Sequence, residues 1–386
     1  MTQPQIGRRD LLTLGAVGAA LLAVGCSRAP ETTTRDDSLG PFGPLGEPDE
    51  LGIQLPAGFT VREVARSREV VPGTNYEWHA APDGGACFPR PGGGWIYVSN
   101  SETVAPLGAG VSALSFGANG EVDQAYRILG GTNLNCAGGP TPWGTWLSCE
   151  ENIFGQVYEC DPTKPGQGQL RPTLGRFNHE AAAVDPVAGH VYLTEDAKDG
   201  RLYRFRPDNY PDLGSGVLEA ASVDGDEVTW VGPIDQNLPQ SFGRPAGTTA
   251  FQGGEGCWYD NGAIYFTTKE DNRVWALQTE SQTLRVIHRP ERDPAGVLRG
   301  VDNVTVSPRG DVVVAEDGGN QELVLITPEG AVVPLLRVTG QPDSELTGPA
   351  FSPDGTRLYF SSQRGTAGNQ AGEGGITYEV LGPFSG

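Results

Sequence analysis

The chain has 386 residues, a formal net charge of -21 at pH 7 and a sequence pI near 4.5. A surface this acidic repels a phosphate backbone, so we expect no nucleic-acid partner. The 56 Gly and 31 Pro indicate many turns, and seven Trp, eleven Tyr and thirteen Phe argue against disorder, so composition favours a turn-dense all-β protein.

The N-terminus is predicted to be an export signal. Over residues 1–26, Arg8 and Arg9 precede an apolar run that ends before Cys26. Twin arginines before a short apolar segment are typical of twin-arginine export, and the run is too short for a stable membrane span. Lipidation of Cys26 and ordinary cleavage nearby are the two alternatives. Residues 27–50 are expected to form a flexible tether, and the mature protein is expected in the periplasm or cell envelope, meeting the membrane only through a lipid at Cys26.

A strand–turn–strand pattern then recurs six times. The copies lie at residues 84–102, 135–151, 179–196, 253–271, 302–318 and 346–363. Asn-Gly at 261–262 and Asp-Gly at 354–355 are strong hairpin signals. A hairpin that cannot bury both faces alone is expected to pack beside its copies, so residues 51–386 are predicted to form a single domain, a six-bladed β-propeller. An ordinary β-sandwich is the alternative.

The copies also predict where chemistry lies. The start of the first strand and the end of the second lie at the same end of an antiparallel hairpin, so polar residues at these points converge on one mouth of a central channel. First-strand starts supply Asn135, Cys136, His179, Glu180, Glu255, Asp302 and Asn303. Second-strand ends supply Asn100, Glu150, Glu151, Glu195, Asp196, Glu270, Asp271, Glu316 and Asp317.

So many acidic groups near one axis repel one another unless cations neutralise them. We therefore expect metal ligation by the set that recurs at equivalent points, namely Glu150, Glu195, Glu255, Glu316 and Asp302. Oxygen ligands suit Ca²⁺, whereas a thiolate among them suits a transition metal such as iron. A single acidic residue after a strand would be interpreted as a solvated loop residue. Acidic residues at equivalent positions of several repeats favour metal ligation instead.

Five cysteines follow the leader, and Cys136 is our choice for a functional thiolate; a small buried apolar role is the alternative. Cys149 and Cys160 flank a short connection and could bridge adjacent strands. His179 could be a metal ligand, or it could contact a ligand or the substrate. Arg176 and Arg364 lie near predicted channel mouths and are candidates for contact with an anionic substrate.

Several segments of the chain resemble the PhoX family of bacterial alkaline phosphatases. They are CAGGPTPWGTWLSCEEN, GRFNHEAAAVDP, YLTEDAKDGRLYRF, GGEGCWY, DNVTVSPRGDVVVAEDGG and FSPDGTRLYFSSQ, and the resemblance runs from about residue 40 to 365. It implies a six-bladed propeller with iron and calcium that hydrolyses phosphate monoesters outside the cytoplasm. It also implies that Cys136 is the iron-bound thiolate and that Glu195 and Glu316 are iron ligands, so that these three are the catalytic residues. The implied calcium or bridging ligands are Glu150, Glu151, Glu180, Glu255, Asp302 and Asn303.

The expected function is thus an exported, monomeric, metal-dependent phosphomonoesterase acting on a small-molecule phosphate ester, with iron and calcium as Lewis acids. The chain lacks the long insertions of the larger phosphatases, which leaves two alternatives open. One is a calcium-dependent lactonase-type propeller hydrolase, and the other is a non-catalytic, metal-stabilised binding protein of the cell envelope. Bound iron would discriminate against the lactonase, which needs no thiolate.

Overall fold

The computed structural model describes residues 40–368 and 372–385, and within them the regular structure is almost entirely β. The predicted leader and Cys26 lie outside the described residues. Short 3-10 turns interrupt the loops at η2 (Ala105–Leu107), η3 (Pro172–Leu174), η4 (Gln240–Phe242), η5 (Pro290–Arg292) and η6 (Gly365–Ala367). In the described part of the chain, none of the helical segments combines the length and apolarity needed to cross a bilayer.

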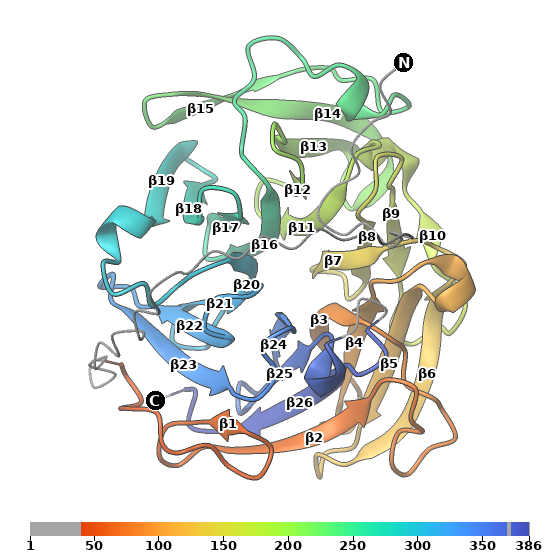
Figure 1. The fold of residues 1–386 in the computed structure, drawn as a ribbon. Coiled ribbons are helices and arrows are strands. Elements are labelled where there is room, and N and C mark those ends of the chain that lie inside the picture. The colour runs from red at the N-terminus through yellow and green to blue at the C-terminus, as the bar shows by residue number, and fades with distance from the viewer. Residues whose placement is uncertain (1–39, 369–371, 386) are drawn as a thin grey trace, which may run out of the picture. The chain divides into compact units, whose positions relative to one another are not determined.

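The innermost strand of each repeat faces a common axis (Figure 1). These strands contact one another in chain order, and the last contacts the first, so they close a ring. The inner strands are β3 (Pro82–Pro89), β7 (Asn135–Pro140), β11 (His179–Asp185), β16 (Gly254–Asp260), β20 (Val301–Val306) and β24 (Leu346–Phe351).

Each inner strand pairs antiparallel with a second strand, and each second strand pairs with a third. The second strands are β4 (Trp95–Ser101), β8 (Trp146–Glu150), β12 (His190–Glu195), β17 (Ala263–Thr268), β21 (Val312–Glu316) and β25 (Arg357–Ser362). The third strands are β5 (Gly110–Phe116), β9 (Val157–Cys160), β13 (Leu202–Asn209), β18 (Arg273–Gln278), β22 (Glu322–Ile326) and β26 (Ile376–Leu381).

The outer strands complete the sheets and tie the ends of the domain together. They are β6 (Val122–Gly130), β10 (Gln169–Leu170), β14 (Asp212–Asp224), β15 (Glu227–Val231), β19 (Thr283–His288), β23 (Val332–Val338), β1 (Ile53–Gln54) and β2 (Thr60–Arg66). The early strand β2 pairs with β26 near the C-terminus, and β1 pairs with β23, so distant parts of the sequence close the ring (Figure 1).

The predicted all-β, propeller-like fold is confirmed. Hydrogen bonds divide the strands into five sheets, because β15 and β19 join two repeats into one nine-stranded sheet. That junction is a single register pair, Glu227 with Thr283. The six-blade count therefore stays a prediction, to which we return below.

The predicted hairpin at Asn261-Gly262 is confirmed. Asp260 pairs with Ala263, and the two residues between them have φ of 44° and 82°. Asn and Gly tolerate these positive φ values, which a two-residue type I′ turn requires.

Core side chains fill the space between neighbouring sheets. One apolar cluster joins strands β22, β23, β25 and β26, and Phe42 packs against it, with its ring 5.1 Å from that of Phe59. The tether is predicted to include residues 40–50, yet Phe42 packs against this core and Leu45 bridges Pro56. The packed part of the chain therefore begins before residue 51.

Candidate metal centre

A β-bulge near the start of every inner strand positions the candidate site. The first residue of each inner strand pairs with the last residue of its second strand, as Asn135 does with Glu150, and the register then shifts within the next few residues. A bulge re-aims the side chain that it carries. In five of the repeats the second residue of the inner strand is ionisable, namely Asp83, Cys136, Glu180, Glu255 and Asp302.

These residues and four others form four overlapping groups of three. Within each group, one ligand atom from each residue lies within 4.8 Å of the ligand atoms of the other two. We call their union the acidic ring; its members are Asp83, Glu102, Cys136, Glu151, Glu180, Glu255, Asp302, Asp317 and Glu345. Cys136 belongs to two of the groups: its Sγ donates to Oε1 of Glu180 at 3.0 Å and lies 3.6 Å from Oδ2 of Asp83. Shared members link the four groups, so they form one continuous band of carboxylates that includes the Cys136 thiol.

The ring is largely removed from water. Glu180 and Glu255 are fully buried, and Asp302 is nearly so. Burial raises the pKa of Glu255 well above its ordinary value; Lys269 opposes this shift, whereas the charges of Asp196, Glu180 and Asp302 reinforce it. A cluster of this kind gains free energy when cations bind, because each cation offsets carboxylate repulsion.

Side chains of neighbouring repeats hold the bulges in place. Oγ1 of Thr194 on β12 donates to the carbonyl of Glu255 at 2.5 Å, and Oγ1 of Thr267 on β17 donates to that of Asp302 at 2.5 Å. Nδ2 of Asn100 on β4 donates to the carbonyls of Cys136 and Ala137. These contacts make the ring geometry a property of the packed sheets rather than of mobile loops.

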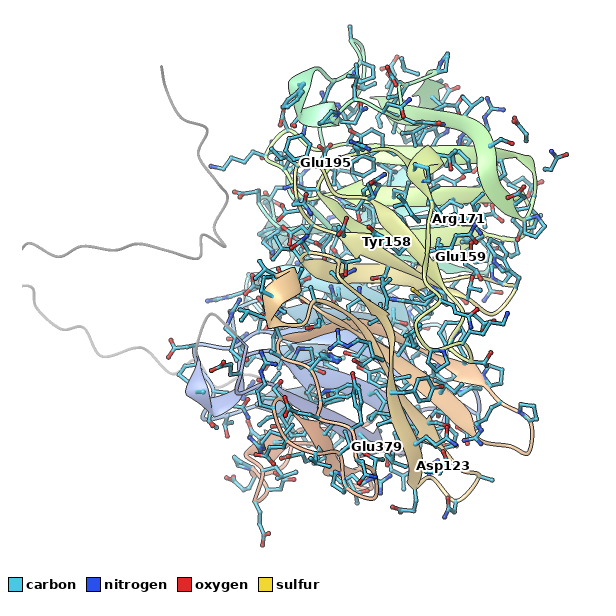
Figure 2. All side chains as sticks on the ribbon, turned by 90° about the vertical axis from the view of Figure 1, so that its right-hand side faces the viewer. Asp123, Tyr158, Glu159, Arg171, Glu195 and Glu379 are labelled. Atoms are coloured by element: carbon cyan, nitrogen blue, oxygen red, sulfur yellow. The ribbon has the colours of Figure 1, made fainter. Side chains whose placement is uncertain are left out.

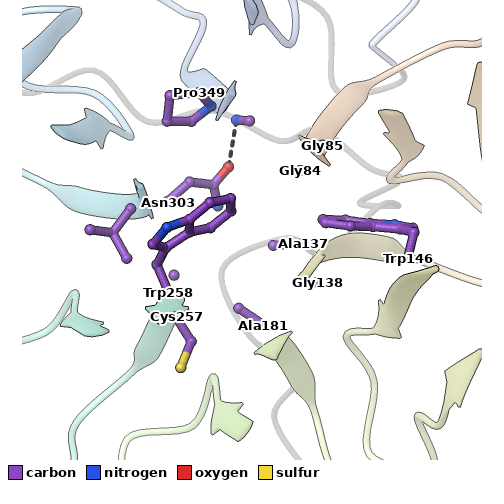
Figure 3. Close-up of a pocket in the computed structure, with 13 residues that line it drawn as sticks. Gly84, Gly85, Ala137, Gly138, Trp146, Ala181, Cys257, Trp258, Asn303 and Pro349 are labelled. Carbon is purple, nitrogen blue, oxygen red and sulfur yellow. Dashed lines mark hydrogen bonds between the residues drawn. The ribbon is translucent and has the colours of Figure 1, made fainter. Parts of the chain in front are cut away.

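A small pocket lies between the inner strands, next to the residues of the acidic ring (Figure 3). The third residues of the inner strands line it, namely Gly84, Ala137, Ala181, Gly256, Asn303 and Gly348. A Cβ at Gly84 would lie 2.5 Å from Cα of Ala137, so the close approach of the inner strands requires glycine there. Asn303 is the large exception: its Oδ1 accepts from the amide of Gly348 at 2.6 Å, as drawn in Figure 3, and its Nδ2 donates to Asp302.

The structure brings together five of the predicted ligands, Cys136, Glu151, Glu180, Glu255 and Asp302. Asn303 lies beside them, but its oxygen is engaged by backbone. Their roles as ligands stay predictions.

Three other predicted ligands lie outside the acidic ring. Glu150, Glu195 and Glu316 are the last residues of β8, β12 and β21, and the ring members Glu151 and Asp317 directly follow the first and the last of them. Glu195 accepts hydrogen bonds from Arg244, Tyr203 and the amide of Arg201, at the end of its sheet (Figure 2). These contacts place the three carboxylates in structural roles outside the acidic ring, and their predicted roles as ligands, with those of Glu195 and Glu316 as catalytic residues, stay predictions.

Backbone amides donate hydrogen bonds to the other two carboxylates, those of Glu316 and Glu150. Glu316 accepts from the amides of Arg299, Asn320 and Glu322 at 2.7–3.0 Å, and burial raises its pKa to about 8. Glu150 accepts from the amides of Asn133 and Gln156, and burial raises its pKa too. Each carboxylate thereby closes a loop at the end of its strand.

The substrate-contact candidates also separate. His179 is fully buried, its ring stacks on Phe177, and burial lowers its pKa to about 3, so we no longer place it at the site. Arg176 is half-buried and its backbone bridges Pro239. Only Arg364 of these three is seen to touch the ring in the described residues, with Nη2 3.0 Å from Oε2 of Glu345.

Sequence reasoning did not place Asp83, Glu102 or Glu345 at the site, and it placed Asp317 at the channel mouth without predicting it as a ligand. The missed signal is the residue that directly follows each second strand: Glu102, Glu151, Asp196, Lys269, Asp317 and Gln363. The sequence prediction favoured the last residue of each second strand, namely Glu150, Glu195 and Glu316, and these residues lie outside the acidic ring. Outside the ring, acids such as Glu159 have nearby bases, here Arg171 at 2.6 Å (Figure 2).

All five cysteines of the described residues are free, so Cys149 and Cys160 do not form the suggested bridge.

The family model described as alkaline phosphatase PhoX matches residues 100–153, 152–286 and 274–365. The chain belongs to the PhoX family. A comparison with curated proteins gave no match.

Among solved structures, the PhoX-family fold is similar to Pseudomonas fluorescens PhoX in complex with vanadate, a transition state analogue. The TM-score is 0.69 at 16% identity, over 87% of this chain and 97% of that chain. A gluconolactonase from Xanthomonas campestris is similar with a TM-score of 0.50 at 13% identity, over 89% and 99% of the two chains. A Bacteroides thetaiotaomicron protein of unknown function has a TM-score of 0.52 at 10% identity, over 84% and 76%. At these identities the structural likenesses speak for the fold, and the family assignment rests on the sequence match.

Proposed function

We propose that this chain is an exported, metal-dependent phosphomonoesterase and that the acidic ring is its active site. Family membership supports a hydrolase of the alkaline phosphatase type. The observation that carries the proposal to these residues is the buried meeting of the Cys136 thiol with carboxylates from neighbouring inner strands. The thiol also favours this function over the lactonase alternative, for which oxygen ligands would suffice.

The donor atoms fit the metals that the family implies. Carboxylate oxygens suit calcium, and a thiol within reach of carboxylates suits iron. We propose that Asp83, Glu102, Cys136, Glu151 and Glu180 hold the iron-containing part, since these residues make up the two groups that include the sulfur. When bound, such metals would supply Lewis-acid activation of the phosphoryl group and stabilisation of its developing charge.

The chain itself contributes a rigid arrangement of ligands. Asp83 is held by the amide of Gly84 at 2.7 Å and by Nε2 of Gln363 at 2.6 Å; the same Nε2 lies 2.7 Å from Glu102. Arg364 carries a positive charge beside Glu345 at the rim, with its side chain 16% exposed. It remains our candidate for contact with the anionic substrate, a small phosphate ester.

The propeller is proposed to have six blades. Two halves of the nine-stranded sheet, β11–β15 and β16–β19, each repeat the inner-to-outer order of the other sheets, and one register pair, Glu227 with Thr283, joins them into a single sheet. The proposed site combines residues from all of the sheets, so it exists only in the folded chain. Twin-arginine export of an already folded monomer to the periplasm or envelope fits such a site.

Hydrolysis of p-nitrophenyl phosphate at alkaline pH, with Ca²⁺ and iron supplied, tests the function. We expect Cys136→Ala and Glu180→Gln to reduce kcat at least 100-fold, because each removes a proposed ligand. Glu316→Gln is the matched control: it is an equally buried acid one residue before the ring position, and it should keep activity within severalfold in folded protein. Full activity in Cys136→Ala, or an inactive but metal-loaded wild type, would contradict the proposal.

A further inference from the structure

Two of the four groups in the acidic ring share one pattern of assembly. In this pattern, a group consists of three residues. They are the second residue of one inner strand, the residue directly after the second strand of the same repeat, and the second residue of the next inner strand. Asp83–Glu102–Cys136 and Cys136–Glu151–Glu180 obey it. Asp302–Asp317–Glu345 follows it in its first two members, but its third, Glu345, directly precedes β24. Glu180–Glu255–Asp302 departs from it, because it joins the second residues of three successive inner strands.

The same pattern between β16 and β20 selects Glu255, Lys269 and Asp302. Lys269 directly follows β17, so it holds the position that Glu102, Glu151 and Asp317 hold in their repeats. Here an ammonium group replaces the third carboxylate of the group.

The ammonium lies where a cation would be held. Nζ of Lys269 is 2.8 Å from Oε1 of Glu255, 3.4 Å from Oδ2 of Asp317 and 3.9 Å from Oδ2 of Asp302. Glu255 is fully buried, whereas the Lys269 side chain is 18% exposed and reaches in from the rim. A positive charge amid three carboxylates from separate strands offsets their repulsion as a bound ion would.

We propose that Lys269 is a built-in cation that occupies one divalent-cation position of the acidic ring. This inference rests on the proposed metal-dependent function. The ring then divides into a thiol-containing arc, Asp83 to Glu180, that holds exchangeable metals, and an opposite arc around Lys269 where the charge is supplied covalently. This chain would then bind one divalent cation fewer than a ring with a carboxylate in place of Lys269.

The test counts calcium ions per chain. The full-length purified protein is stripped with EDTA, titrated with CaCl₂ by calorimetry, and analysed for bound metal by mass spectrometry. Lys269→Gln removes the charge and adds an amide oxygen, so it should bind one more Ca²⁺ per chain than the wild type. Lys269→Arg keeps the charge and should bind the wild-type number, as should Lys164→Gln, because Lys164 pairs with Asp161 and is 59% exposed.

Stability provides a second readout that does not depend on phosphatase activity. If Lys269→Gln folds poorly without metal, its Tm should rise more on adding CaCl₂ than that of the wild type. Equal calcium counts and equal Tm shifts in Lys269→Gln and wild type would overturn the role of Lys269 while leaving the proposed function standing. Absence of bound metal from both proteins would overturn the proposed function, and this inference with it.

Discussion

At the scale of single residues, one position along a strand separates a site residue from a structural one. Glu150 and Glu151 are neighbours, as are Glu316 and Asp317, and only the second of each pair belongs to the acidic ring, because successive side chains of an extended chain point to opposite sides. Glu195 meets Arg244 and Tyr203, whereas Glu180, the second residue of the partner strand, faces Cys136. The two glutamates are both nearly fully buried, so burial alone could not have told them apart.

This contrast predicts opposite phenotypes for two isosteric substitutions. Glu195→Gln should lower the free energy of unfolding by about 3 kcal/mol, because it leaves the buried Arg244 charge poorly compensated. Its metal content should be unchanged. Glu180→Gln should lose bound metal, and in the presence of EDTA it should be at least as stable as the wild type, since it removes carboxylate repulsion. Denaturant unfolding and metal analysis of both variants check this; loss of metal in Glu195→Gln would contradict it.

At the scale of elements, the bulged start of each inner strand is the device that builds the site. A regular strand would place the second residue against its neighbouring sheet, whereas the bulge turns it toward the axis. Asn100, Thr194 and Thr267, each at the penultimate position of its second strand, donate hydrogen bonds to the bulge of the following repeat. The site is therefore assembled by contacts between sheets.

Thr194→Val tests this device with almost no change in shape. It removes the donor to the Glu255 carbonyl and the acceptor for the Ala181 amide, so the unfolding free energy should fall by roughly 1–3 kcal/mol. Thr229→Val is the control, because Thr229 is exposed and its hydroxyl makes one 3.3 Å contact with the carbonyl of Ser222. We expect less than about 0.5 kcal/mol there by thermal or denaturant unfolding. Equal effects of the two substitutions would argue against a role in holding the bulge.

At the scale of the whole molecule, the closed ring of inner strands concentrates negative charge at its centre. The chain carries a net charge of -21, and the ring brings eight of its carboxyl groups into contact range around one thiol. Folding must therefore work against this repulsion unless cations are bound. Strand β2 pairs with β26 and so closes the circle of sheets. Carboxylate repulsion in the acidic ring and strand pairing at the ends of the domain therefore affect the stability of the same folded unit.

Metal removal should accordingly destabilise the entire domain. A bound ion present at 100 times its Kd adds about 2.7 kcal/mol to the unfolding free energy, so EDTA should lower the Tm and excess CaCl₂ should restore it. Scanning calorimetry in both conditions measures the shift, and MgCl₂ serves as a control for ionic strength. A Tm that does not respond to chelation would show that the carboxylates need no bound cation.

The sequence by itself determined the repeats, the strand-rich fold, the Asn261-Gly262 hairpin and the meeting of acids at one channel mouth, because these depend on local periodicity and turn chemistry. It also singled out Cys136, Glu180, Glu255 and Asp302, which stand at the starts of recognisable strands.

Only the tertiary structure decided which of two adjacent acids faces the axis. That choice depends on the bulges, on hydrogen bonds from the neighbouring sheet and on partners such as Arg244, which lies 49 residues from Glu195 in the sequence. The contacts that close the ring, and the insertion of Lys269 between carboxylates of separate repeats, have no local signature for the same reason: they are interactions between side chains that only the packed sheets bring together.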